Sequence, residues 1–122
     1  MRILPVVLLL SIASIPVAAS TMSDYTSCAV YYRMQVGHFK SRDLAPMADL
    51  EREKMNTLME FAKNAADAEY GDMGEELFNE QWRDILTEMT DVINRNYTNI
   101  SRLKQRYGKR CSKLIESINN GS

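Results

Sequence analysis

Apolar residues recur at helical spacing along four stretches of this 122-residue chain. In the last stretch, residues 99–118, the steps of three and four residues place one set of apolar side chains on a single side of a helix: Ile100, Leu103, Tyr107, Cys111, Leu114 and Ile118. The opposite side carries a set of basic residues: Arg102, Arg106, Lys109 and Lys113. The pattern predicts an amphipathic helix with one core face and one basic face.

Three earlier stretches show the same periodicity, at residues 24–41, 46–70 and 75–92. Ser23 is the expected N-cap of the first, Pro46 fits the first turn of the second, and Gly71 fits its end. The third stretch has a seven-residue apolar repeat, which is typical of helices that pack at a shallow angle: Phe78, Trp82, Ile85, Met89 and Val92. We therefore expect an all-helical protein.

The first helix is apolar beyond the single stripe that a surface helix needs. Such a helix is either deeply buried or meets a partner. We predict that its extra apolar positions, together with two methionines of the next helix, form an interaction surface for self-association or for a protein partner: Val30, Tyr31, Met34, Met55 and Met59.

Residues 1–19 have the form of a secretory signal peptide. Arg2 precedes a run of about 15 apolar residues, and Val17, Ala18 and Ala19 fit a cleavage site before Ser20. The run is shorter than the roughly 20 residues that a membrane span needs, and two prolines interrupt it. We expect an exported protein, periplasmic or secreted, whose residues 20–122 form one domain that does not span the membrane.

The two cysteines, Cys28 and Cys111, predict one disulfide in an exported chain. In an antiparallel up-down-up-down four-helix bundle, both lie at the same end and can bond. If the last two stretches were instead fused into one long helix, Cys111 would lie about 50 Å along it. We therefore expect a four-helix bundle closed by one disulfide, with three helices, the last of them fused, as the alternative.

Charge is distributed unevenly along the chain. From Asp43 to Asp91 there are fourteen acidic and four basic residues, whereas from Arg95 to Lys113 there are seven basic residues and no acidic one. The basic helix could simply lie beside acidic ones, or it could present an anion-binding face to lipid headgroups or other envelope polyanions. Nucleic acid is not expected as a partner, because no aromatic residues interleave the basic stripe.

Residues for catalysis are scarce. The chain has one histidine, His38, and no His-Glu-x-x-His, Glu-x-x-His or Cys-x-x-Cys motif, so we expect neither an enzyme nor a bound cofactor. The alternative is a carrier, in which His38 and Met47 hold haem or Met55 and Met59 hold copper(I). We predict a non-catalytic binding or interaction domain.

Overall fold

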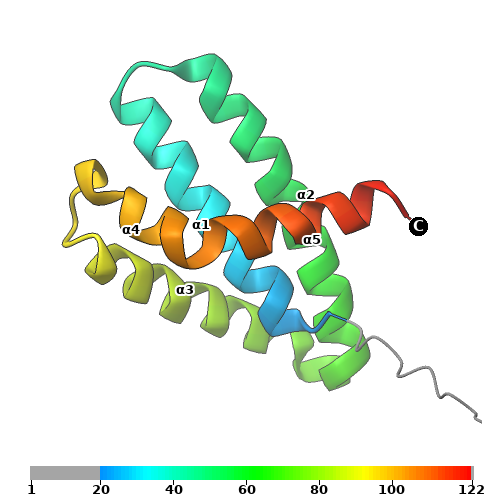
Figure 1. The fold of residues 1–122 in the computed structure, drawn as a ribbon. Coiled ribbons are helices and arrows are strands. Elements are labelled where there is room, and N and C mark those ends of the chain that lie inside the picture. Colours follow the sequence, from blue (N-terminus) through cyan, green and yellow to red (C-terminus); the bar gives the residue numbers. More distant parts are fainter. Residues whose placement is uncertain (1–19, 122) are drawn as a thin grey trace, which may run out of the picture.

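A computed structural model describes residues 20–121, which are almost entirely helical and contain no strand (Figure 1). The expected signal peptide, residues 1–19, lies outside the described residues. Within the described part of the chain, no helix combines the length and the apolar character that crossing a bilayer requires.

Helix α1 spans Met22–Ser41 and begins two residues earlier than the sequence predicts. Its N-cap is Thr21, whose hydroxyl accepts the N–H of Asp24 at 3.3 Å. In return, the Asp24 carboxylate accepts the N–H of Thr21 at 2.9 Å. This reciprocal pair satisfies two backbone donors that a helix start leaves without partners, whereas Ser23 lies inside the first turn.

Helix α2 spans Ala45–Tyr70, with Pro46 in its first turn as predicted. A short 3₁₀ turn, η1 (Gly71–Met73), leads to α3, which spans Gly74–Val92. The corner is tight, since a Cβ atom at Gly74 would lie 2.6 Å from the carbonyl oxygen of Ala66. Only glycine lets the two helices approach so closely here.

The C-terminal segment is helical but irregular. After α3, Asn94 and Arg95 adopt left-handed backbone angles, with φ of 55° and 57°, and turn the chain. It then forms four short pieces: η2 (Tyr97–Asn99), α4 (Ser101–Leu103), the π-helical η3 (Lys104–Gly108) and α5 (Lys109–Asn119).

The regular up-down-up-down four-helix bundle is not confirmed. Three helices are long, α1, α2 and α3, and the three-helix alternative fits that number better, although α3 ends at Val92 and does not continue as a rod. In Figure 1 the C-terminal segment crosses α1. The physical reason lies at η3, where a wider π turn interrupts the regular helix and Gly108 lies against the Tyr31 hydroxyl.

Helix α1 forms the centre of the fold, and α2, α3 and the C-terminal segment all contact it. The predicted disulfide is confirmed. It joins Cys28 of α1 to Cys111 of α5, with 5.3 Å between their Cα atoms and both side chains buried. Of the six apolar residues predicted to share one side of the last helix, Leu103 and Cys111 are buried in the main core. The other four are partly buried against it: Ile100, Tyr107, Leu114 and Ile118.

Candidate functional site

The predicted apolar interaction surface is not a surface. Val30 is fully buried, and Tyr31 and Met34 are only 3% and 2% exposed, in the same core as Leu103. Met55 and Met59 are partly buried against that core. The prediction is therefore wrong for the three α1 residues, and packing is the reason, since Tyr107 and Gly108 of the C-terminal segment lie against Tyr31. Of the two readings of an all-round apolar helix, deep burial is the correct one.

The tyrosines on this side of α1 form a structural cluster. The ring of Tyr31 packs edge-on against that of Tyr32, with centroids 5.0 Å apart, and lies 6.2 Å from that of Tyr107. The Tyr31 hydroxyl accepts a hydrogen bond from the buried side chain of Gln35 at 2.8 Å. Burial raises the pKa of Tyr31, and burial with the nearby Glu51 raises the pKa of Tyr32 to about 12. Both hydroxyls therefore stay protonated at neutral pH.

The basic residues predicted on the last helix are all exposed. We call them the basic face: Arg102, Arg106, Lys109 and Lys113. Within residues 20–121, ion pairs join only Arg52 to Asp49 and Lys54 to Glu51, so none neutralises the basic face. The positive charge of the basic face is therefore not neutralised by direct ion pairs with the acidic helices.

Further cations extend the basic face toward the disulfide. Lys104 and Arg110 are also exposed, and the Arg110 guanidinium lies 5.2 Å from the centre of the Tyr107 ring. Arg110 and Lys113 line a hollow of about 240 Å³ beside Cys28. Asp24 is the acidic residue in that hollow. Arg110 and Lys113 thus place positive charge close to the covalent link with α1.

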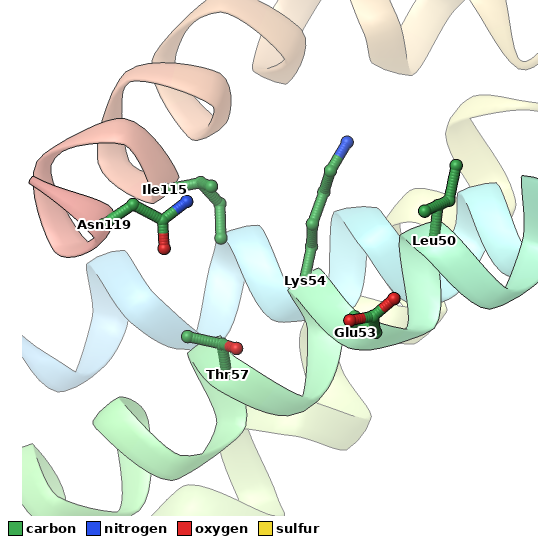
Figure 2. A pocket seen from close by; sticks show the side chains of 6 residues that line it. All are labelled: Leu50, Glu53, Lys54, Thr57, Ile115 and Asn119. Carbon is green, nitrogen blue, oxygen red and sulfur yellow. The ribbon is translucent and has the colours of Figure 1, made fainter.

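A groove between α2 and α5 was not predicted from the sequence. The groove has a volume of about 310 Å³. Figure 2 shows the residues that line it, four from α2 and two from α5: Leu50, Glu53, Lys54, Thr57, Ile115 and Asn119. Leu50 is 61% exposed and points to the same side as Lys54. Periodicity marks each helix as amphipathic but cannot reveal that the two lie side by side, so the sequence held no signal for this groove.

His38, the predicted ligand of a carrier, lies near the end of α1. It lines a hollow of about 350 Å³. Among the described residues, no methionine lines this hollow, so the hollow does not place His38 beside Met47. Desolvation, and then the positive charge of Arg42, lower the pKa of His38. Within residues 20–121, no group of three or more His, Cys, Asp or Glu side chains could hold a metal ion.

Comparisons with protein-family models, with curated proteins and with solved structures found no match to this chain. The function must therefore be argued from the geometry of its own residues.

Proposed function

We propose that this protein is a non-catalytic binding domain of an oxidising, extracytoplasmic compartment, and that it attaches to anionic lipid surfaces through its basic face. The observation that carries the proposal is the exposure of the four basic side chains together with the lack of any ion pair to them within residues 20–121. A positive surface without internal counterions is free to take its counterions from a partner.

Two further features support this proposal. The disulfide agrees with an oxidising environment, and the signal peptide expected at residues 1–19 would direct the chain there. The cations also lie on a helical segment that the disulfide anchors to the central helix. Several cations on one anchored segment suit an extended anionic surface, where each basic residue contributes roughly 1 kcal/mol.

The proposal is tested with the doubly substituted variant Arg106→Glu/Lys109→Glu. The wild-type protein should sediment with vesicles that contain phosphatidylglycerol, should not sediment with phosphatidylcholine vesicles, and should be released by salt. Removing two cations from a surface contact is expected to weaken binding by at least about 30-fold, and reversing their charge should weaken it further.

The matched control changes the net charge by the same amount elsewhere. Lys63→Glu/Arg83→Glu replaces two exposed cations, on α2 and α3, and should retain most of the vesicle binding. Equal losses in both variants would mean that net charge alone, and not the basic face, governs binding. Salt-independent binding, or none at all by the wild-type protein, would contradict the proposal outright.

A further inference from the structure

A second concentration of positive charge lies at the end of α1, outside the basic face. Arg33, Lys40 and Arg52 line a hollow of about 570 Å³ between α1, α2 and Tyr97. The hollow that contains His38 adjoins it, because Ser41 and Tyr97 line both. We call the charged basic side chains of the two hollows the cationic corner: Arg33, Lys40, Arg42, Arg52 and Arg95.

The cationic corner holds little negative charge of its own. Among residues 20–121, no acidic side chain lines either hollow. Asp49 binds Arg52, with 2.7 Å between the carboxylate oxygen and the guanidinium nitrogen, and no other side chain of the corner forms an ion pair within this part of the chain. Cations gathered in this way repel one another, and a bound anion would relieve that repulsion.

The wall that the two hollows share is held in place by packing and by hydrogen bonds. The ring of Tyr97 lies so close to Gly37 that a Cβ atom there would collide with it. The Asn96 side chain accepts the N–H of Thr98 at 2.9 Å. The Asn99 side-chain amide donates to the carbonyl oxygen of Ile93 at 2.9 Å. The backbone of the shared wall is thus held in place, so that binding has to order only the cationic side chains.

The chemistry of the lining identifies the ligand class. Four of the cations are arginines, whose planar guanidinium groups donate two parallel hydrogen bonds to a phosphate. The Tyr97 hydroxyl, which lines both hollows, supplies a further donor. The hydroxyls of Ser41 and Thr98 already donate to the His38 carbonyl and the Asn96 side chain. Because the cations are divided between two adjoining hollows, we infer that the cationic corner binds a ligand with two linked phosphate groups, one in each hollow.

Calorimetric titration of the disulfide-bonded protein at low ionic strength tests this inference, with pyrophosphate and orthophosphate as probes. Pyrophosphate should bind at least tenfold more tightly than orthophosphate, because only pyrophosphate engages both hollows. The variant Arg42→Gln/Arg95→Gln should weaken pyrophosphate binding at least tenfold. The control Lys63→Gln/Arg83→Gln removes the same charge from exposed positions outside both the corner and the basic face, and it should stay within twofold of the wild type.

Equal losses in the two double variants, equal affinity for the two probes, or no saturable binding of pyrophosphate would each overturn the inference. If Arg42→Gln/Arg95→Gln does not fold, Arg42→Lys replaces it. That variant keeps the charge but removes the paired donors, and it should still weaken binding.

A competition arm identifies the source of the phosphate groups. Vesicles with diacylglycerol pyrophosphate, a lipid whose headgroup has two linked phosphates, that displace pyrophosphate from the Arg106→Glu/Lys109→Glu variant would assign a lipid headgroup. Vesicles that leave it bound would assign a soluble ligand. Since that variant lacks a working basic face, the cationic corner and the vesicle-binding proposal can fail separately.

Discussion

At the scale of single residues, the contact between Gly37 and Tyr97 ties the C-terminal segment to the central helix. Glycine inside a helix costs about 1 kcal/mol relative to alanine, so the fold accepts an intrinsic penalty at this position. The structure supplies the reason, because the Tyr97 ring occupies the space that a side chain at position 37 would need. The same contact forms a wall of the cationic corner.

We predict that Gly37→Ala destabilises the protein by about 1–3 kcal/mol, because the added methyl group forces the Tyr97 ring to move. The free energy of unfolding in urea measures the effect. In a Tyr97→Ala background the ring is absent, so Gly37→Ala should instead stabilise the protein, by up to about 1 kcal/mol through helix propensity. The same sign in both backgrounds would show that the contact with Tyr97 does not decide the outcome.

At the scale of elements, the start of α1 shows how neighbouring candidates for a cap are distinguished. Thr21 and Ser23 are both plausible N-caps by residue type. Asp24 decides between them, because it lies three residues after Thr21 and can return the hydrogen bond. Ser23 instead accepts a hydrogen bond from Gln81 of α3 at 2.7 Å.

Thr21→Ala should destabilise the protein by about 1 kcal/mol, the usual cost of losing an N-cap side chain. The measurement is the urea midpoint at constant slope, with Ser23→Ala as the matched control. The control should change stability by less than about 0.5 kcal/mol, since Ser23 forms an exposed bond outside the cap. A larger effect for Ser23→Ala than for Thr21→Ala would place the cap at the position predicted from the sequence.

At the scale of the whole molecule, the disulfide joins the two parts of the chain that close the main core. Cys28 lies early in the central helix and Cys111 in the segment that crosses it, 83 positions later. Linking residues so far apart removes many conformations from the unfolded chain. The bond therefore stabilises the covering of α1 that buries Val30, Tyr31 and Met34.

Cys28→Ala/Cys111→Ala should lower the free energy of unfolding by roughly 2–5 kcal/mol, as is typical when a small domain loses a native disulfide. Urea unfolding with and without a strong reductant measures the effect. Reductant should destabilise the wild-type protein and leave the variant unchanged. If the wild-type protein is equally stable in both conditions, the disulfide does not contribute to the free energy of unfolding.

Much of the fold and part of the candidate site could be predicted from local patterns. The helical class, the Cys28–Cys111 bond and the exposure of the basic face follow from spacing and residue type. Local patterns could not predict whether the extra apolar side chains of α1 are buried inside the protein, because a helix that is apolar all round can also meet a partner. The cationic corner also escaped prediction, since Arg33, Arg52 and Arg95 come from three separate segments.

The sequence by itself determined what depends on neighbours along the chain. Helical periodicity, a proline in the first turn of α2 and a glycine at its end act over a few residues, so they can be read without knowing the fold. The tertiary structure alone decided which face of α1 is covered, where the π turn falls over Tyr31, and which cations share a hollow. Those outcomes depend on packing between residues that are distant in the chain, and packing free energy is not a local property.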